Sequence, residues 1–202
     1  MPEPLLVTLL RHGAVEGRPY VFRGAADPPL SALGWTQMER AYVRAALPPP
    51  DAIATSPLAR CRAFAERAAG AARLPLAIAP DLAEMRFGEW EELTGDEARA
   101  LDADRFEAFR ADPRAAAPPG GERYDDFAAR VDAGLRALAG AHTGHVLVVT
   151  HAGVIHAALA QALGLAAASI HRVALPPAAT CRLSLLDGAA PVLLALNFAG
   201  DP

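Results

Sequence analysis

Two short motifs carry residues that could do chemistry. Arg11-His12-Gly13 directly follows one apolar run, and His151-Ala152-Gly153 directly follows another. An arginine binds phosphate or carboxylate through parallel charge-assisted hydrogen bonds, and a histidine acts as base, nucleophile or metal ligand. A neighbouring glycine lets the backbone approach a ligand closely. The repeated pattern predicts a site for an anion with a reactive imidazole.

The apolar runs before these motifs are the elements that must position them. Leu5–Leu10 and His145–Thr150 each contain few polar residues, which is typical of strands buried on both faces of a parallel sheet. Open α/β sheets bind ligands at the carboxyl ends of such strands. If the two strands are neighbours, His12 and His151 lie side by side.

A third arginine is expected at the same sheet edge. Asp51–Thr55 is predicted to be a strand, followed by a helix with Ser56 as N-cap and Pro57 at its first position. Arg60 then lies one turn into the helix and leans back toward the strand end, beside a helix N-terminus that favours anions. The alternative is an exposed helical arginine, which is what we expect of Arg62.

An acidic segment, Asp81–Glu92, mixes carboxylates with large apolar residues, as a packed functional loop does. Glu84 lies between Leu82 and Met85. A carboxylate held among apolar groups has its charged form disfavoured, which suits a general acid. The later acids of this segment are expected to be solvated: Glu89, Glu91 and Glu92.

The remaining segments alternate between helix and strand patterns, without an internal repeat or a low-complexity linker. We therefore expect one domain over residues 1–202. Pro75 restricts its strand to a sheet edge or a strand start. The other predicted helices are 31–45, 97–110, 122–140 and 154–163, and the third of these is expected to carry exposed Asp126–Arg130 and Asp132–Arg136 pairs. The other predicted strands are 74–78, 182–186 and 192–198, and the last two are joined around Asp187-Gly188. Residues 14–30 are expected to form a long functional loop.

Composition narrows the function. The net charge of −4 argues against a nucleic-acid binder, although a cleft with local positive charge can still take a small anionic substrate. All 19 basic residues are arginine, which indicates a compositional bias of the whole chain, so an arginine is not by itself a sign of function. Cys61 and Cys181 lack metal or redox spacing and are expected as buried thiols in a reducing cytoplasm. No run approaches about 18 apolar residues, and Met1–Pro4 lacks a basic flank, so no membrane span is expected.

Arg11, His12, Arg60 and His151 together suit a tetrahedral dianion such as a phosphoryl group. Metal binding is the rival explanation for two histidines. However, His151 and His156 are five residues apart, off the spacing of a helical metal pair, and no carboxylate cluster accompanies them. We therefore expect neither a metal nor another cofactor, and a small phosphorylated substrate as partner.

The chemistry of a phosphoryl group in this site follows from the residue types. A neutral imidazole can attack phosphorus and carry the group as phosphohistidine, provided that its other nitrogen donates a proton to a fixed acceptor. Arg11, Arg60 and a protonated His151 would stabilise the equatorial oxygens. Glu84 could protonate the leaving alkoxide and then take a proton from the attacking water.

Four segments carry a resemblance to a known family. In order along residues 5 to about 165 they resemble the motifs of the histidine phosphatase superfamily, the phosphoglycerate-mutase-like fold. The resemblance implies a three-layer α/β/α sandwich with a mostly parallel central sheet, His12 as nucleophile and Glu84 as proton donor, with Arg11, Arg60 and His151 forming the phosphate pocket. The segments are Leu10–Gly13, Ser56–Cys61, Leu82–Glu91 and Val149–Val154.

Trp90-Glu91 and Pro119–Glu122 are similar to the alpha-ribazole phosphatase and small broad-specificity phosphatase branch. Departures from the family pattern, among them Ala14-Val15 after the first motif, leave the substrate open. Hydrolysis of a phosphomonoester is our first hypothesis. A phosphoglycerate mutase and a non-catalytic module that binds a phosphorylated ligand are the alternatives, and a homodimer is also open. Candidates for contacting the alcohol half of the substrate are Tyr20, Arg23, Arg86 and His156.

Overall fold

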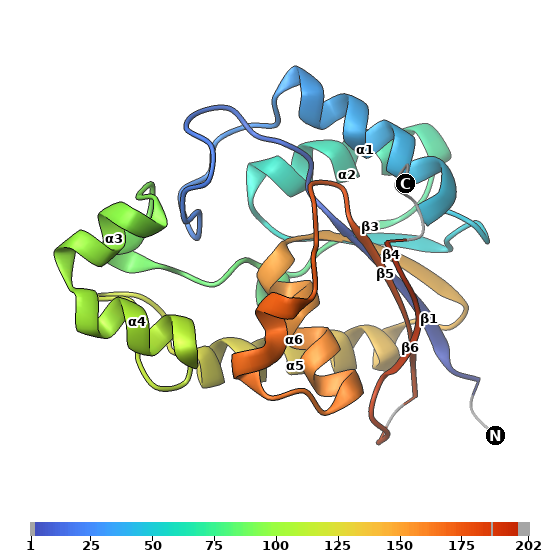
Figure 1. Ribbon diagram of the computed structural model, residues 1–202. Helices are drawn as coiled ribbons and strands as arrows, with labels where there is room; N and C mark the ends of the chain where they lie inside the picture. The colour runs from blue at the N-terminus through green and yellow to red at the C-terminus, as the bar shows by residue number, and fades with distance from the viewer. Residues whose placement is uncertain (1–2, 187, 198–202) are drawn as a thin grey trace.

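A single mixed sheet forms the centre of the computed structural model, which describes residues 3–186 and 188–197. Its strands lie in the order β3-β2-β4-β1-β5-β6 (Figure 1). Neighbours from β3 to β1 run parallel, whereas β5 pairs antiparallel with both β1 and β6. The strands are β1 (Leu5–Arg11), β2 (Ala52–Thr55), β3 (Leu76–Ile78), β4 (His145–Thr150), β5 (Thr180–Leu185) and β6 (Val192–Leu196).

Two pairs of helices cover the two faces of the sheet, with α1 and α2 on one side and α5 and α6 on the other (Figure 1). The helices α3 and α4 lie beside these layers, away from the sheet. The α/β/α sandwich with a mostly parallel sheet is therefore confirmed. The helices are α1 (Ala32–Ala45), α2 (Ala59–Ala72), α3 (Gly95–Leu101), α4 (Ala103–Ala111), α5 (Tyr124–Ala141) and α6 (Ala152–Leu163), with short 3-10 turns η1 (Pro80–Leu82), η2 (Gly88–Trp90) and η3 (Ala167–Arg172).

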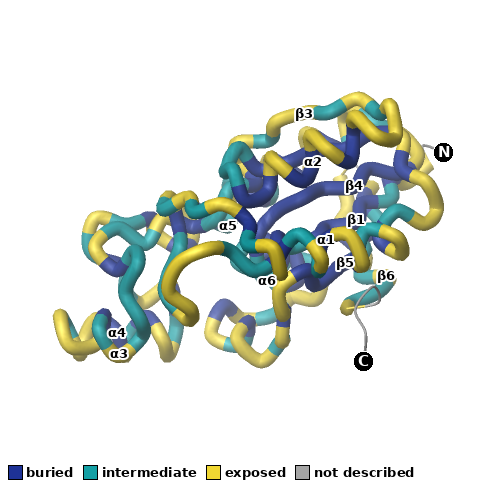
Figure 2. Tube along the Cα trace, turned by 90° about the horizontal axis from the view of Figure 1, so that it is seen from above, coloured by how far each residue is buried: buried dark blue, intermediate teal, exposed yellow. Residues whose placement is uncertain are grey.

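The sheet divides the core into two layers. Successive residues of a strand point to opposite faces. Accordingly, Val146 and Val148 of β4 pack in the cluster under α5 and α6, whereas Leu147 and Val149 pack in the cluster under α1 and α2. All six residues of β4 are buried, and the central strands form a continuous buried band (Figure 2). The prediction of strands buried on both faces is confirmed.

The strands that precede the two histidine motifs are direct neighbours, as expected. In their parallel register Leu6 pairs with His145 and Arg11 pairs with Thr150. The two strands therefore end at the same level of the sheet. This register brings His12 and His151 to one point on its carboxyl edge.

Two predicted helices differ from the structure. The helix expected from Ser56 begins at Ala59 with Leu58 as N-cap. The Ser56 hydroxyl accepts the Leu58 N–H at 3.3 Å and also makes a contact described below. The helix expected over 97–110 is broken into α3 and α4 at Asp102. The Asp102 carboxylate accepts the Arg105 N–H at 3.0 Å and so caps the second helix.

The other element boundaries shift by a few residues. The helix α5 starts after Glu122, which lies outside it, and α6 starts at Ala152. The strand β5 begins earlier than predicted, at Thr180. Asp187 of the predicted turn and Phe198 of the predicted last strand lie outside the described residues. In the described part of the chain no helix combines the length and apolar character that crossing a bilayer requires.

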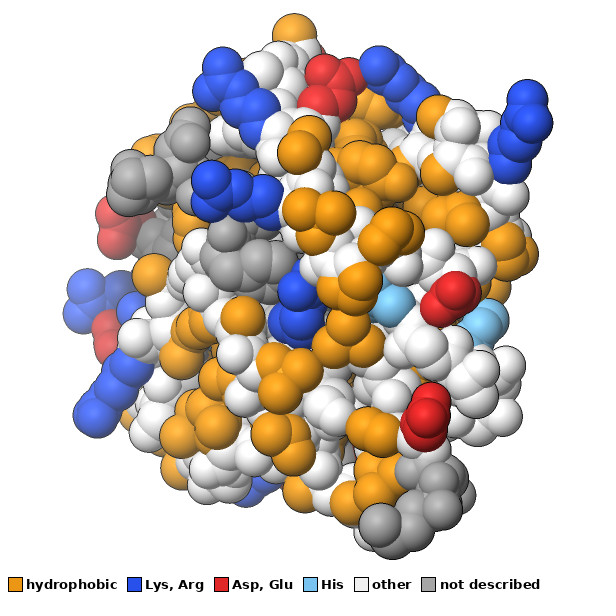
Figure 3. All heavy atoms as spheres, turned by 90° about the vertical axis from the view of Figure 1, so that its right-hand side faces the viewer, with side chains coloured by type: hydrophobic (Ala, Val, Ile, Leu, Met, Phe, Trp, Pro, Cys, Tyr) orange, Lys and Arg blue, Asp and Glu red, His pale blue; other side chains and the backbone are white. Residues whose placement is uncertain are grey.

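The two edges of the sheet are β3 and β6. The short strand β3 directly follows Pro75, as the position of this proline predicted. The strand β6 exposes Val192 and Leu194. Hydrophobic side chains gather on the side of the molecule that carries this edge (Figure 3). The possible homodimer stays a prediction.

Candidate active site

His12 and His151 lie together at the carboxyl ends of β1 and β4. Their ring centroids are 5.3 Å apart and the ring planes form an angle of 65°. The His12 N–H donates to the carbonyl of Thr150 at 2.8 Å, which ties the two strand ends together. Both imidazoles are buried. The structure therefore brings together the two histidines that the sequence predicted to meet.

The tautomer of His12 follows from its partner. Nδ1 lies 2.8 Å from the carbonyl oxygen of Gly13. A carbonyl only accepts hydrogen bonds, so Nδ1 carries the proton and Nε2 presents a lone pair. Burial, followed by the charges of Arg60 and Arg11, lowers the pKa of His12 to about 3. His12 is therefore neutral at physiological pH, as a nucleophile must be.

Gly13 is required by its surroundings. A Cβ at this position would come within 2.3 Å of the carbonyl oxygen of Gly34 in α1. Any side chain would push the strand end away from this helix. The glycine thus keeps the carbonyl that orients His12 in its place.

His151 is the N-cap residue of α6, and its Nε2 lies 2.7 Å from the hydroxyl of Ser56. The Cys61 thiol lies 3.5 Å from the same nitrogen. Burial, followed by the charge of Arg60, lowers the pKa of His151 well below its ordinary value. The expectation of a protonated His151 applies to a site that holds a phosphoryl group, and it stays a prediction. A dianion beside the ring would favour the charged form again.

Arg60 is completely buried, so the alternative of an exposed arginine is excluded. Its Nη groups donate to the carbonyls of Ala26 at 2.7 Å and of Arg23 and Gly24 at 3.0 Å each. Its charge is also paired with Asp27 at 3.4 Å. The long loop over 14–30 thus fixes this cation at the sheet edge.

The N-terminus of α2 is capped by the same loop. The Asp27 carboxylate accepts the Ala59 N–H at 2.7 Å and the Arg60 N–H at 3.5 Å. We expected these N–H groups to favour a bound anion, and Asp27 occupies them instead. Sequence reasoning missed this cap because Asp27 lies 32 residues before Ala59.

Glu91 shapes the loop from its other side. Its Oε1 accepts the N–H groups of Ala25 at 2.9 Å and Phe87 at 3.1 Å, and its Oε2 accepts the Ala26 N–H at 2.7 Å. The expectation that Glu91 is solvated is therefore wrong. The backbone that receives Arg60 is held by this carboxylate.

Arg11 and Arg60 each have a buried donor to spare. Arg11 Nη1 donates to the carbonyl of Leu175. Among the described residues, neither Arg11 Nε nor Arg60 Nε has a hydrogen-bond acceptor, although both atoms are buried. Buried polar atoms are normally paired. An oxyanion between the two guanidinium groups would supply these acceptors.

Glu84 lies against the start of α6, next to His151. Its Oε1 accepts the Met85 N–H at 2.9 Å and its Oε2 accepts the Gly153 N–H at 3.2 Å. A Cβ on Gly153 would lie only 2.1 Å from Oε1, so this position must stay glycine. The structure therefore brings Glu84 to the start of the helix that His151 caps, and its role as proton donor stays a prediction.

Arg130 anchors the segment that carries Glu84. Its guanidinium pairs with the Glu122 carboxylate at 2.7 Å and donates to the carbonyl of Glu84 at 2.9 Å. Further donations reach the carbonyls of Asp81 and Ala83. The predicted exposed pair of Arg130 with Asp126 is therefore wrong, whereas the Asp132–Arg136 pair is confirmed at 2.8 Å. The i,i+4 spacing within the helix could not indicate Glu122 as the partner of Arg130, because Glu122 lies before the helix begins.

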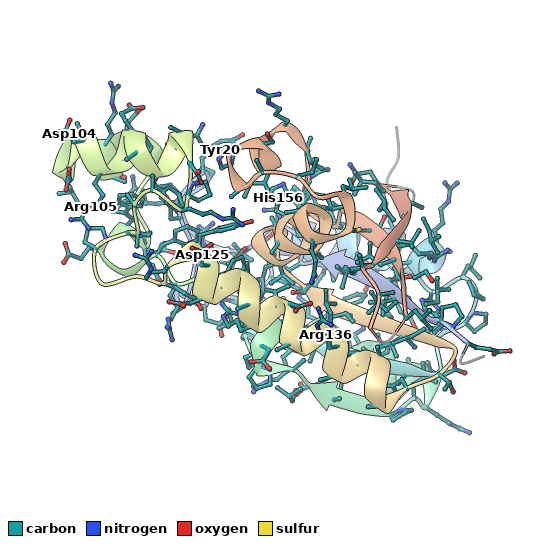
Figure 4. All side chains as sticks on the ribbon, turned by 90° about the horizontal axis from the view of Figure 1, so that it is seen from below. Tyr20, Asp104, Arg105, Asp125, Arg136 and His156 are labelled. Atoms are coloured by element: carbon teal, nitrogen blue, oxygen red, sulfur yellow. The ribbon has the colours of Figure 1, made fainter. Side chains whose placement is uncertain are left out.

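The four candidates for contacting the alcohol fall in different places. Tyr20 is 94% exposed and Arg86 is exposed as well. Arg23 forms an ion pair with Glu92 at 3.2 Å, and its charge contributes to the lowered pKa of His12, after burial and the other arginines. His156 Nε2 donates a hydrogen bond to the Val173 carbonyl at 2.9 Å, because a carbonyl oxygen only accepts. Figure 4 shows His156 on α6 and Tyr20 nearer to α4.

A cavity of about 220 Å³ adjoins Glu84. His156 lines it, whereas Tyr20 and Arg86 do not. Sequence reasoning did not predict this cavity. Its aromatic walls are Phe22, Phe87, Phe109, Tyr124 and Phe127.

Both cysteines are free and buried, as expected. Burial raises the pKa of the Cys61 thiol beyond its ordinary range and that of Cys181 to about 12. Within residues 3–186 and 188–197, no three His, Cys, Asp or Glu side chains are grouped so that they could hold a metal ion.

Comparison with known proteins identifies the family. The family description "Histidine phosphatase superfamily (branch 1)" matches residues 7–198, and the chain belongs to this family. The family that the sequence motifs resembled is thereby confirmed.

Two curated relatives and a solved structure illustrate the likeness. A bifunctional protein of Mycobacterium tuberculosis is 35% identical over 176 residues, which cover 84% of this chain and 47% of the relative. The chain thus spans about half the length of the mycobacterial relatives it matches. The adenosylcobalamin/alpha-ribazole phosphatase of Escherichia coli is 30% identical over 161 residues, 79% of each chain. A mycobacterial glucosyl-3-phosphoglycerate phosphatase has a TM-score of 0.82 at 27% identity, covering 95% of this chain and 98% of that one.

Proposed function

We propose that the chain is a phosphatase that hydrolyses small phosphomonoesters through a phosphohistidine on Nε2 of His12. One observation carries the proposal. A neutral imidazole with its tautomer fixed by Gly13 lies beside a second histidine, with Arg11 and Arg60 near enough for their charges to lower its pKa and a carboxylate at the start of the adjoining helix. Phosphatase relatives that match most of both chains support the same activity.

In the first step the substrate phosphoryl group binds against Arg11 and Arg60, whose unpaired Nε–H groups donate to its oxygens. Nε2 of His12 attacks phosphorus in line with the leaving oxygen, a P–N bond forms and the P–O bond to the alcohol breaks. The Nδ1–H bond to Gly13 remains and stabilises the positive charge on the ring. Glu84, entering protonated, gives its proton to the leaving alkoxide.

In the second step water attacks the phosphohistidine from the side that the alcohol has left. Glu84, now ionised, takes a proton from this water, so it ends the cycle protonated again. The P–N bond breaks, inorganic phosphate forms and His12 returns to its neutral state. His151 takes up a proton from solvent when the phosphoryl dianion binds and returns it to solvent when inorganic phosphate leaves. No step requires a metal ion.

Two experiments test the reaction. Acid-free quenching during turnover should trap a phosphoenzyme that is stable to base and lost in acid, with the added mass on the peptide containing His12. The His12→Ala variant should form none and should hydrolyse no ester. Full turnover by this variant would overturn the proposal.

A panel of phosphomonoesters, assayed with a chelator present, tests the substrate. The names of the relatives suggest alpha-ribazole phosphate and glucosyl-3-phosphoglycerate as members, next to a nucleoside phosphate, a sugar phosphate and 3-phosphoglycerate. Isomerisation of the phosphoglycerate faster than its hydrolysis would indicate a mutase instead. Phosphate binding without release of inorganic phosphate from any ester would indicate a non-catalytic binding module.

Three further expectations belong to the proposal. The chain forms a single histidine-phosphatase domain over residues 1–202, which limited proteolysis would test. A homodimer is tested by sedimentation of the purified chain. A cytoplasmic location is tested by fractionation of the source cells.

A further inference from the structure

The aromatic cavity, defined by Phe22, Phe87, Phe109, Tyr124 and Phe127, joins parts of the chain that are distant in sequence. Its walls come from the long first loop, the segment after Glu84, α4 and α5. The rings of Phe22 and Phe87 are 4.9 Å apart and those of Phe87 and Phe109 are 6.4 Å apart. These rings pack on one another and present a fixed apolar surface.

Glu84 connects this cavity to the proposed reaction. Its carboxylate and Gly153, which donates to it, both line the cavity. A group that Glu84 protonates must lie within hydrogen-bond distance of its oxygens. In the proposed reaction that group is the leaving oxygen of the alcohol. The carbon skeleton attached to this oxygen therefore extends into the aromatic cavity.

We propose that the aromatic cavity binds the alcohol half of the substrate and selects an alcohol with an apolar, ring-sized group. This inference rests on the proposed function and adds the class of substrate to it. Aromatic side chains bind rings through burial of apolar area and edge-to-face contacts. Small polar alcohols such as glycerol leave these surfaces uncovered.

The charged residues around the cavity limit which substituents the ring of the bound alcohol can carry. Arg110, His156 and His171 line it, and Glu84 is the one carboxylate among its described lining residues. Arg110 and His171 are exposed, so they form its outer rim. A neutral or anionic substituent on the ring suits this rim, and a cationic substituent does not.

Esters with matched leaving groups test the apolar preference. Ethyl phosphate and 2-phenylethyl phosphate release alkoxides of similar basicity, so a difference in kcat/KM between them reports binding of the ring. We expect kcat/KM to be about 10- to 100-fold higher for the phenylethyl ester. Glycerol phosphate should resemble ethyl phosphate. Equal values for all three esters would overturn the inference.

A pair of variants locates the preference. Phe22→Ala removes one wall of the cavity, and we expect the ratio of kcat/KM for the phenylethyl ester to that for the ethyl ester to fall at least threefold. Tyr42→Ala is the matched control, since Tyr42 is a half-buried aromatic residue on α1 outside the cavity. It should leave the preference unchanged. A preference that survives Phe22→Ala, or that falls equally in both variants, contradicts the location.

A second pair of variants tests the outer rim of the cavity, where exposed side chains can be changed without disturbing the hydrophobic core. Arg110→Gln should lower kcat/KM about two- to fivefold for a 4-carboxyphenylethyl ester and leave the phenylethyl ester unchanged. Arg105→Gln on the same helix is the control, because Arg105 lies at the outer end of α3 and α4, away from His156 (Figure 4). An equal loss in the two variants contradicts the role of Arg110.

These outcomes separate the inference from the proposed function. Hydrolysis that depends on His12 but ignores the ring refutes the cavity and leaves the phosphatase intact. A ring-bearing ester that binds but releases no phosphate refutes the phosphatase. In that case competition by 2-phenylethyl phosphonate, stronger than by ethyl phosphonate, would still support the cavity.

Discussion

The two parts of the site are built in opposite ways. The strand-end site, defined as Arg11, His12, Arg60 and His151, is polar and fixed by backbone carbonyls at the end of a buried sheet. The aromatic cavity is lined mainly by rings from two loops, from α4 beside the sheet layers and from α5, with Glu84 in its wall. Glu84 lines the cavity and also accepts the Gly153 N–H at the start of the helix that His151 caps.

The difference indicates a division of labour. Strands buried on both faces hold their ends rigidly, which suits groups that must meet a reacting atom within a fraction of an ångström. Helices and loops at the edge of the fold can vary without disturbing these groups. Under the two proposals above, the strand-end site determines the reaction and the aromatic cavity determines the alcohol. Changes in the first should affect all substrates alike, and changes in the second should affect them selectively.

The largest effect is expected at His12. In His12→Gln the nucleophile is lost, so kcat/KM should fall at least about 10⁴-fold for every ester, whether or not it carries a ring. Steady-state kinetics on ethyl and 2-phenylethyl phosphate measure this. The ratio between the two esters should persist in any residual activity. A loss confined to one ester would contradict the division of labour.

Glu84→Gln should separate substrates by their leaving group. Alkyl phosphates need a proton on the departing oxygen, so their hydrolysis should slow about 10²- to 10⁴-fold. The nitrophenolate of 4-nitrophenyl phosphate leaves unaided, and its hydrolysis should slow by less than about tenfold. Rates on both esters at one pH measure the contrast. Equal slowing of the two would exclude Glu84 as the proton donor.

The same contrast explains what the sequence could predict. The strand-end site follows from local patterns, because an apolar run predicts a buried strand and the next residues must then lie at its end. His12 and His151 needed only the further condition that their strands are neighbours. Arg60 is buried near His12, whose pKa its charge lowers, although its helix starts later than predicted.

Contacts between distant segments were beyond such patterns. Ser56 accepts the Leu58 N–H as a cap would, but it also reaches His151, and Glu91, which was expected to be solvated, holds the backbone at Ala25 and Ala26. Polar side chains give no sign in the sequence of which distant backbone group they will meet. The aromatic cavity has the same origin, because its rings come from segments without a common period.

Arg130 is expected to have an intermediate effect at the junction of the two parts. Arg130→Met removes the donors that hold the backbone of Asp81, Ala83 and Glu84 and leaves the buried Glu122 carboxylate without its cation. We expect a loss of about 3 kcal/mol in the free energy of unfolding. Hydrolysis of alkyl esters should slow about tenfold, and that of 4-nitrophenyl phosphate less, because a displaced Glu84 matters only where a proton is needed.

Two variants sharpen this test. Arg136→Met on the same helix breaks an exposed pair with Asp132, and it should cost less than about 1 kcal/mol and leave both rates unchanged (Figure 4). Arg130→Lys should recover part of the alkyl rate, since it restores the charge beside Glu122. Urea unfolding and the two rates are measured on the same samples. If Arg130→Met slows both esters equally, the arginine stabilises the fold without positioning Glu84.

The smallest effect is a proton taken up when an anion binds. Burial, followed by nearby arginines, lowers the pKa of both His12 and His151 in the folded chain, to about 3 for His12. Such groups destabilise the fold as the pH falls below the ordinary histidine value of about 6.5, because the unfolded chain then binds protons that the folded chain does not. A dianion in the strand-end site reverses the shift.

Sulfate is the suitable probe, since it stays a dianion across this range. Its affinity should rise as the pH is lowered from 8 to 5, by up to tenfold per pH unit where one full proton is taken up. Calorimetry in buffers of different ionisation enthalpy counts the protons. We expect His151→Gln to abolish most of the uptake, because His12 donates Nδ1–H to Gly13 and keeps Nε2 unprotonated for attack. Proton uptake that persists in this variant but disappears in His12→Gln would assign the proton to His12. His12 would then be charged, not neutral, when an anion is bound.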